Sequence, residues 1–416
     1  MQLAEIDFRQ KRSPAESLDR AQDAIDSGAL RADPEDASAY TTKSYVLLRR
    51  FRIPSLTGQG DQRPLLEQIA QAAARAVELD PQDAHTWIAL GNAHIYRGPY
   101  ETGHGGNGEV WLNQALDEFA KALAIEPSNV RAHNDLGIAH RWLATAFDKA
   151  GKDPLPEYKE ALHSYERAAD IDPRYLPACT NQVDLYVAIA DHDNAIGVDP
   201  RTAVDSAQRV GARCLAIDRN FYKLHDTLAQ AELALARYLV ETENNPMTAL
   251  TAAREALDRA EAGQHDLSLL SFHRLVAANT EARFLLRSGT NPTSTIAAGR
   301  AALTKTTGLM PLTARLLVEA AHLDLAEARW AAHERQPPMP ALEKARDEAE
   351  QAVTRDPGLA SAYCTAAEVY LELATAQPSR ASRERGIQLI DKALQLNSRL
   401  SEAKAIRAAL QQLPIP

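Results

Sequence analysis

The sequence is poor in aromatic residues, cysteine and long apolar runs. Phe, Trp and Tyr make up 6% of the 416 residues, and the only cysteines are Cys179, Cys214 and Cys364. The cysteines lie far apart without a C-x-x-C pair, which argues against a zinc ribbon or a disulfide framework and favours a reducing compartment. No uncharged run approaches the roughly 18 residues of a transmembrane helix. We therefore expect a cytoplasmic protein without membrane insertion.

Basic residues are also in the minority. The chain has 46 Lys and Arg against 56 Asp and Glu, a formal net charge of −10. This balance argues against general affinity for nucleic acid or acidic membranes. The abundant residues are alanine, leucine, glutamate and arginine, which favour helices over strands.

Proline recurs at a fixed interval. Pro81, Pro127 and Pro173 are 46 residues apart, and the same count continues through Arg219, His265 and Pro311 to Pro357. Pro34 begins the series 47 residues before Pro81. A fixed period of this length is the signature of a repeat architecture.

A second proline series lies between the members of the first, also spaced by 46 residues: Pro154, Pro200, Pro246, Pro292 and Pro338. Asp or Asn precedes the first four of these prolines. Such a dipeptide favours a helix start, because the side chain caps free N–H groups and proline sacrifices no helical hydrogen bond there. Each repeat is therefore predicted to contain two helices.

The repeat resembles the tetratricopeptide repeat (TPR), with its pattern W-x2-L-G-x2-Y, then A-x3-F-x2-A, then P. One unit matches at Trp87, Leu90, Gly91, Ala115, Phe119, Ala122 and Pro127, and the next at His133, Leu136, Gly137, His140, Ala161, Tyr165, Ala168 and Pro173. The resemblance implies an all-α, right-handed α-solenoid of stacked antiparallel helix pairs without a β-sheet. The ordinary repeat has about 34 residues, so about 12 more sit between the two helices here.

We expect one solenoid over residues 1–416. It comprises a leading helix at 13–32, eight helix pairs at 36–397, and a capping helix with a tail at 398–416. The extra residues should lengthen one helix to Ala150. In the preceding unit we expect the helix to break at Gly98-Pro99 and to continue as an exposed, mobile loop to Gly108.

That expected loop contains Gly103, Gly105 and Gly108 in a G-x-G-x-x-G pattern. A dinucleotide site would need a strand before it, and a P-loop would need Lys and Ser or Thr where Glu109 and Val110 stand. We interpret it as a turn that binds no nucleotide. His133 and His140 are better explained as buried repeat positions than as zinc ligands. We predict no catalytic residues, no metal and no cofactor.

The TPR resemblance also implies a groove lined by the first helix of each pair. Counting from the turn prolines predicts these groove residues: Tyr45, Arg49, His85, Asn92, Tyr96, Arg131, Asn134, Arg141, Trp142, Lys223, Asp226 and Gln230. Arginine, amide and aromatic groups suit an extended acidic or C-terminal peptide. The family's carboxylate clamp is only partly met. Asn92 matches, but Ile88, Asp135, Pro177 and Asn181 replace its other members.

We therefore predict a protein-protein interaction scaffold with a protein or peptide partner and no nucleic acid. One alternative is the regulatory or substrate-docking region of a larger bacterial serine/threonine protein kinase, whose arrays the long repeats resemble. The chain itself has no kinase signatures such as H-R-D or D-F-G. A helical enzyme with an unrecognised site is the third hypothesis. The sequence leaves the partner and the oligomeric state open.

Overall fold

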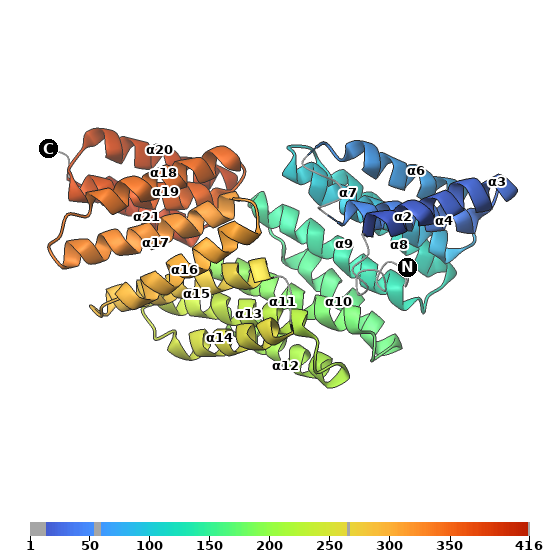
Figure 1. The fold of residues 1–416 in the computed structure, drawn as a ribbon, viewed down its shortest axis with the longest axis horizontal. Helices are drawn as coiled ribbons and strands as arrows, with labels where there is room; N and C mark the ends of the chain where they lie inside the picture. Colours follow the sequence, from blue (N-terminus) through green and yellow to red (C-terminus); the bar gives the residue numbers. More distant parts are fainter. Residues whose placement is uncertain (1–13, 54–59, 264–266, 415–416) are drawn as a thin grey trace. The chain divides into compact units, whose positions relative to one another are not determined.

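The computed structural model describes residues 14–53, 60–263 and 267–414, and every regular element in these ranges is a helix (Figure 1). Residue 13, the turn position His265 and the last two residues lie outside the described ranges. The chain divides into two compact units. Unit 1 comprises residues 1–147 and 153–181, and unit 2 comprises residues 148–152 and 182–416.

Unit 1 begins with a continuous helix made of α2 (Pro14–Asp23), a π-helical turn (Ala24–Ala29) and α3 (Leu30–Ala32). Helix pairs follow it: α4 (Ala37–Phe51) with α6 (Arg63–Leu79), α7 (Ala84–Gly103) with α8 (Gly108–Ile125), and α9 (Val130–Lys149) with α10 (Leu155–Ile171). The expected lengthening of α9 to about residue 150 is confirmed. The first turn of α11 (Leu176–Ile196) completes the unit.

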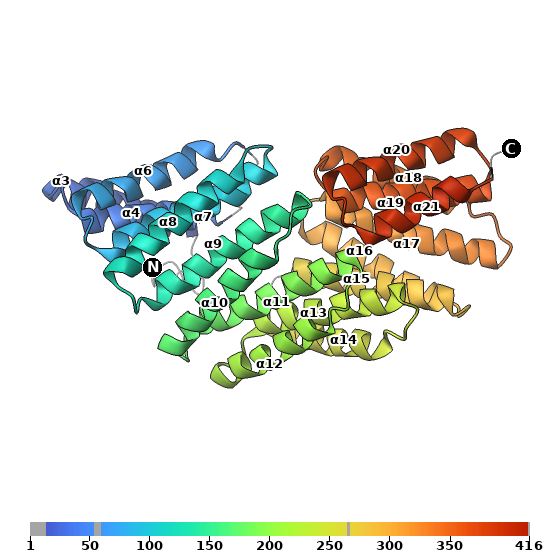
Figure 2. The same ribbon diagram turned by 180° about the vertical axis from the view of Figure 1, so that it is seen from behind.

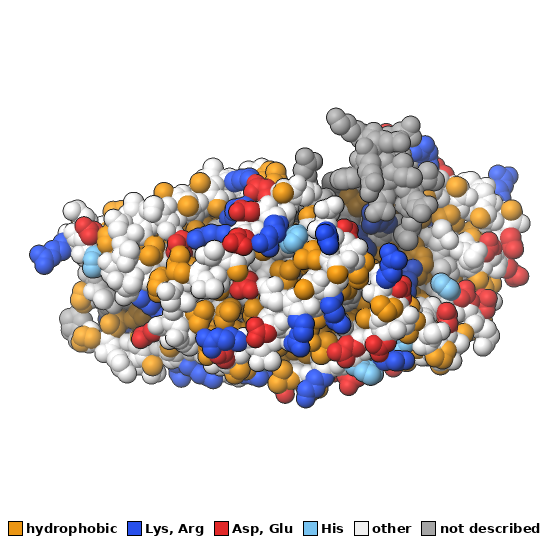
Figure 3. Space-filling model, turned by 90° about the horizontal axis from the view of Figure 1, so that it is seen from below, with side chains coloured by type: hydrophobic (Ala, Val, Ile, Leu, Met, Phe, Trp, Pro, Cys, Tyr) orange, Lys and Arg blue, Asp and Glu red, His pale blue; other side chains and the backbone are white. Residues whose placement is uncertain are grey.

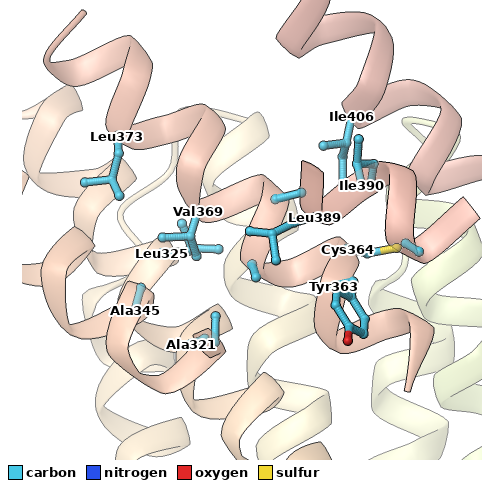
Figure 4. Close-up of a cluster of buried hydrophobic side chains, with 14 of the residues drawn as sticks. Ala321, Leu325, Ala345, Tyr363, Cys364, Val369, Leu373, Leu389, Ile390 and Ile406 are labelled. Atoms are coloured by element: carbon cyan, nitrogen blue, oxygen red, sulfur yellow. The ribbon is translucent and has the colours of Figure 1, made fainter. Parts of the chain in front are cut away.

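Unit 2 contains the rest of α11 and the helices that follow it: α12 (Arg201–Ile217), α13 (Tyr222–Glu241), α14 (Met247–Ala262), α15 (Leu267–Arg287), α16 (Thr293–Leu309), α17 (Ala314–His333), α18 (Met339–Arg355), α19 (Ala360–Ala376), α20 (Arg380–Leu396) and α21 (Ser401–Gln412). Helices α18 to α21 lie side by side in both views (Figures 1 and 2). The core that they share with α17 interleaves alanines with Leu325, Val369, Leu389 and Ile406 (Figure 4). The predicted all-α class of stacked antiparallel helix pairs is confirmed.

Helices α10, α12, α14, α16 and α18, each the second helix of its pair, begin directly after the prolines of the second series. Helix α10 starts after Pro154 and α14 after Pro246. The preceding polar side chain caps the first turn: Leu155 N–H donates to Asp153 Oδ1 over 3.2 Å, and Met247 N–H donates to Asn245 Oδ1 over 2.9 Å. The Asp/Asn-Pro dipeptide thus sets the start of these helices by satisfying a free N–H group.

Within a pair, a small residue on one helix faces a large ring on the other. A Cβ atom added at Gly91 would lie 2.7 Å from the Phe119 ring, and one at Gly137 would lie 2.6 Å from the Tyr165 ring. Both rings are completely buried. No side chain larger than hydrogen fits at either glycine unless the helices move apart, so the small-to-large pattern of the repeat sets the spacing of the pair.

Each long first helix ends in a residue with positive φ, and these residues recur every 46 positions: Gly105, Gly151, Gly197, Glu243, Gly289 and Arg335. The next N–H donates back to a carbonyl five residues earlier, as from Asn244 to Leu239 O over 2.7 Å. This bonding is the Schellman type of helix end, in which glycine avoids the steric cost of a left-handed residue. The lengthened first helices therefore end in the same backbone geometry from one repeat to the next.

The expected helix break at Gly98-Pro99 is wrong. Helix α7 continues through Pro99 to Gly103, and Gly98 and Glu101 are buried. Contacts beyond the proline hold this last turn, because the Tyr100 hydroxyl accepts from Gln62 N–H over 2.7 Å and Glu101 accepts from Arg63 Nε over 3.1 Å. These tertiary contacts offset the roughly 3 kcal/mol that proline costs within a helix.

The glycines of this stretch have packing roles instead. A Cβ atom at Gly98 would lie 2.6 Å from Leu112 Cγ, and one at Gly108 would lie 2.2 Å from Gly98 O. Gly105 has a φ of 78°. Helices α7 and α8 thus approach closely at Gly98 and Gly108. Only the short turn from Gly103 to Asn107 is exposed, which is less than the expected loop.

In unit 2 the C-terminal helix packs against residues that lie far back in the chain. Asn397 Nδ2 donates to Asp148 O over 3.0 Å, and Ser401 Oγ donates to Ala195 O over 3.1 Å. Glu402 lies 4.0 Å from Arg283. Helix α21 therefore contacts α11 and α15, so that within unit 2 the C-terminal helix occupies part of the surface of the first helices.

The three cysteines differ in their oxidation state. Cys364 is a buried free thiol whose pKa is raised by burial. Cys179 and Cys214 are both in disulfide form. The sequence argued against a disulfide framework and did not predict the bonding of these two residues.

Replacing Gly289 tests the left-handed helix ends. An added Cβ atom meets nothing within 4 Å there, so Gly289→Ala changes only the backbone preference at φ 66°. We expect a loss of about 1 kcal/mol in the free energy of unfolding, measured by urea denaturation. Gly308→Ala is the matched control, because its Cβ atom also meets nothing but lies in helix α16. It should stabilise by up to about 1 kcal/mol. Equal effects of the two substitutions would contradict the assignment.

Candidate functional site

Asp135 of α9 is the centre of a polar cluster in unit 1. Its Oδ2 accepts from Asn92 Nδ2 of α7, and its Oδ1 accepts from Asn134 Nδ2, each over 2.9 Å. Asn134 Oδ1 in turn accepts from Asn181 Nδ2 of α11 over 2.8 Å, and Arg131 Nε lies 3.5 Å from Asp135 Oδ2. We call these five residues the Asp135 cluster. Its amide donors, which include the predicted groove residues Asn92 and Asn134, are already engaged with protein atoms.

Tyr45 of α4 extends this cluster. The Arg131 guanidinium lies over its ring, 4.4 Å from the centroid. Burial raises the pKa of Tyr45 to about 12, so the phenol stays neutral at physiological pH. Burial opposes the charge of Arg131, but Tyr45 and Asp135 together raise its pKa. The pair is a fixed cation resting on a neutral ring.

A second pair of the same kind lies nearby. The Arg52 guanidinium is 5.5 Å from the ring centroid of Tyr96, which also meets Phe51 edge to face at 6.3 Å. Burial raises the pKa of Tyr96, and the charges of Arg52, Arg131 and Arg49 lower it, so the positive charge of all three arginines acts on this phenol. Arg49 and His85 are exposed. Six of the predicted groove residues thus share one region of unit 1: Tyr45, Arg49, Asn92, Tyr96, Arg131 and Asn134.

The remaining predicted residues form smaller groups. On α9, the guanidinium of Arg141 lies 5.1 Å from the ring of its neighbour Trp142. On α13 in unit 2, Asp226 accepts from His273 Nδ1 over 2.6 Å and from Gln230 Nε2 over 3.4 Å. Lys223 is exposed. The α13 side chains therefore form a polar group of their own.

Sequence reasoning missed a ladder of ion pairs in unit 2. Arg283 of α15 lies 2.6 Å from Glu241, and Arg329 of α17 lies 2.8 Å from Glu368 and 2.6 Å from Glu372. Arg283 and Arg329 are 46 residues apart. A basic residue recurring at the repeat period was the signal that could have revealed the ladder.

A pair of carboxylates also stands out in unit 2. Burial first, and then the neighbouring Asp324, raise the pKa of Glu348 to about 8. Arg300 forms an ion pair with Asp324, and Lys344 Nζ lies 3.1 Å from Asp324 Oδ2. Shifted carboxylates can mark acid-base catalysis, but structural networks produce the same shift. The two cations bind this pair into the packing of α16, α17 and α18.

The raised pKa of Glu348 predicts a pH dependence of stability. The unfolded chain releases this proton near pH 4.5, whereas the folded chain holds it up to about pH 8. Stability should therefore fall as pH rises between these values, and Glu348→Gln should remove that part of the fall. Urea unfolding at several pH values measures it. Glu343→Gln, an exposed change on the same helix, should keep the wild-type slope. An unchanged slope for Glu348→Gln would contradict the assignment.

The hydrogen bonds of the Asp135 cluster predict that replacing Asp135 lowers the free energy of unfolding. Asp135→Ala leaves the buried donors of Asn92 and Asn134 without their acceptor, so we expect about 2 kcal/mol of lost unfolding free energy. Chemical denaturation provides the measurement. Asp117→Ala, which removes an exposed carboxylate from α8, should change stability by less than about 0.5 kcal/mol. A cost for Asp135→Ala as small as that of the control would show that the cluster does not organise this face.

Comparison with known proteins places the fold. No protein-family model and no curated protein sequence matches the chain. Among solved structures, a monomeric IFIT1 variant with m7Gppp-AAAA is 12% identical, with a TM-score of 0.51 over 99% of this chain and 80% of that one. A tetratricopeptide repeat protein from Parabacteroides merdae is 14% identical, with a TM-score of 0.43 over 77% of this chain and 99% of that one.

The chain is thus a helical repeat protein with a TPR-like fold, as the sequence resemblance implied. Within residues 14–53, 60–263 and 267–414, no helix is long and apolar enough to cross a membrane. The same residues contain no cluster of three His, Cys, Asp or Glu arranged to hold a metal ion. The resemblance to kinase-attached arrays finds no counterpart among these structures.

Proposed function

We propose that this protein is an interaction scaffold, and that the first helices of unit 1 bind an extended acidic segment of a partner protein. The binding face comprises Tyr45, Arg49, Arg52, His85, Tyr96 and Arg131, and we call it the unit-1 face. The observation that carries the proposal is the occurrence of two cation-aromatic pairs, Arg131 on Tyr45 and Arg52 on Tyr96, around one region.

The arrangement suits a peptide because its parts are held in place before binding. The Asp135 cluster fixes Arg131 from behind, so little side-chain freedom is lost when a ligand carboxylate arrives. Arg49 and Arg52 are exposed and can meet further acidic groups. The rings of Tyr45 and Tyr96 offer apolar surface between these charges, and tyrosine and arginine are the residues that dominate binding energy at interfaces.

The role of the amides differs from the first expectation. Asn92 and Asn134 support the binding face through Asp135, and the proposal gives recognition to the arginines and tyrosines. Arg141, Trp142 and the α13 group of Lys223, Asp226 and Gln230 are left as secondary positions. A protein partner is favoured over nucleic acid by the net charge of −10. On the face seen in Figure 3, basic side chains are interspersed with acidic ones, without the continuous basic stripe of a nucleic-acid footprint.

Site-specific cross-linking tests this proposal. A photoreactive residue at His85 should capture a partner from extract of the native cell, whereas one at Arg75, on the second helix α6, should not. Reversing charge with Arg49→Glu and Arg52→Glu should abolish the capture by repelling an acidic segment. Arg75→Glu with Arg167→Glu is the matched control in unit 1 and should leave the capture at His85 unchanged.

Three outcomes contradict the proposal. Capture that survives the reversal at Arg49 and Arg52 would exclude recognition by the unit-1 face. Equal loss in the control pair would indicate a general charge effect. Adducts that nuclease removes would identify RNA as the partner. Capture of a kinase domain or its substrate would instead place the scaffold in the alternative role of a kinase-docking region.

A further inference from the structure

A charged hollow of about 370 Å³ lies on the first helices of unit 2. Helix α15 contributes Arg283, Leu286 and Arg287 to its lining, α17 contributes Arg329 and His333, and α19 contributes Glu368. Four basic side chains thus face one space with a single carboxylate in the lining. Its volume is within the range of sites that bind small molecules.

The basic side chains come as two equivalent pairs. Arg283 and Arg287 are one helical turn apart on α15, and Arg329 and His333 occupy the same positions 46 residues later on α17. The preceding repeat has Arg237 and Glu241 at these positions, and the following one has Thr375 and Ser379. The double basic pair therefore occurs only where the hollow is found.

These positions belong to the part of the helix that the long repeat adds. Arg329 stands 18 residues after the turn proline Pro311. The groove positions of an ordinary repeat end at Trp142, which is 15 residues after its own turn proline Pro127. The added turns of the unit 2 helices therefore form a surface beside the hollow that an ordinary repeat lacks.

The arginines that α15 and α17 contribute to the hollow differ in how many carboxylates neutralise them. Arg329 has two carboxylate partners, Glu368 and Glu372. Arg283 and Arg287 share one close carboxylate, Glu241, at 2.6 and 3.5 Å, and Glu402 reaches Arg283 only at 4.0 Å. Arg283 is 21% exposed and Arg287 is 42% exposed, so the α15 side keeps guanidinium surface available to a ligand.

We propose that this hollow binds a compact organic anion that carries two or more carboxylate or phosphate groups. One group pairs with Arg283 and Arg287, whose guanidinium groups share Glu241 as their one close carboxylate, and a second reaches His333. Guanidinium forks match the oxygen spacing of both carboxylate and phosphate, so the shared chemistry is that of a small polyvalent oxyanion. The site is independent of the unit-1 face and needs no protein partner.

Isothermal titration of the full chain with citrate and with pyrophosphate tests the proposal at constant ionic strength, with sodium chloride as the reference. Saturable binding of either probe is expected, and the probe that binds more tightly identifies a carboxylate or a phosphate source. Arg287→Gln with His333→Gln should weaken binding at least fivefold. Arg259→Gln with His163→Gln, an exposed pair elsewhere, should leave the affinity unchanged.

The wild-type titration decides the question even where a variant folds poorly. Absence of saturable binding of both probes to the wild-type chain would overturn the proposal. So would a change of less than fivefold in the Arg287/His333 variant when its circular dichroism matches the wild type. A fivefold loss in the control pair as well would show a general charge effect and would equally overturn it.

Discussion

The close contact of two helices through a glycine and a ring is the constraint on which the rest of the structure depends. At Gly91 and Gly137 the facing rings of Phe119 and Tyr165 leave no room for a Cβ atom. Overfilling such a contact costs about 1–3 kcal/mol and moves the helices apart. Because this contact fixes how the two helices of a pair meet, it also fixes which residues of the first helix remain to face a ligand.

The length of the repeat adds a second zone to that face. In unit 1 the ordinary groove positions hold the Asp135 cluster and the aromatic-cation pairs. In unit 2 the added turns carry Arg283, Arg287, Arg329 and His333 and end in left-handed residues such as Gly289 and Arg335. The same helical extension therefore explains both the uniform turn geometry and a charged wall that shorter repeats do not have.

The regular parts of the fold could be predicted because local chemistry decides them. Proline after Asp or Asn marks a helix start whatever surrounds it, and helices α10, α12, α14 and α16 all begin there. Pro99 shows where such rules fail. Contacts from Tyr100 and Glu101 to the start of α6 outweigh the local cost of proline, and no local pattern reveals contacts between residues 38 positions apart.

The closeness of several predicted groove residues in unit 1 could be predicted, but their hydrogen bonds could not. Counting from the turns found Tyr45, Asn92, Tyr96, Arg131 and Asn134, since the register of a helix face follows from its period. That Asp135 would take the amide donors depends on side-chain geometry across three helices. The partners of Arg283 and Arg329 are equally non-local, although the 46-residue recurrence of the two arginines was visible in the sequence.

The central claim is that one 46-residue helix pair, with its left-handed end, recurs along the chain. Amide hydrogen exchange resolved to single residues measures this directly. The hydrogen bonds at Gly106, Val198, Asn244, Thr290 and Gln336 predict slowly exchanging amides at multiples of 46 residues, each beside exposed turn residues. Fast exchange at these positions, or protection without the 46-residue period, would contradict the account.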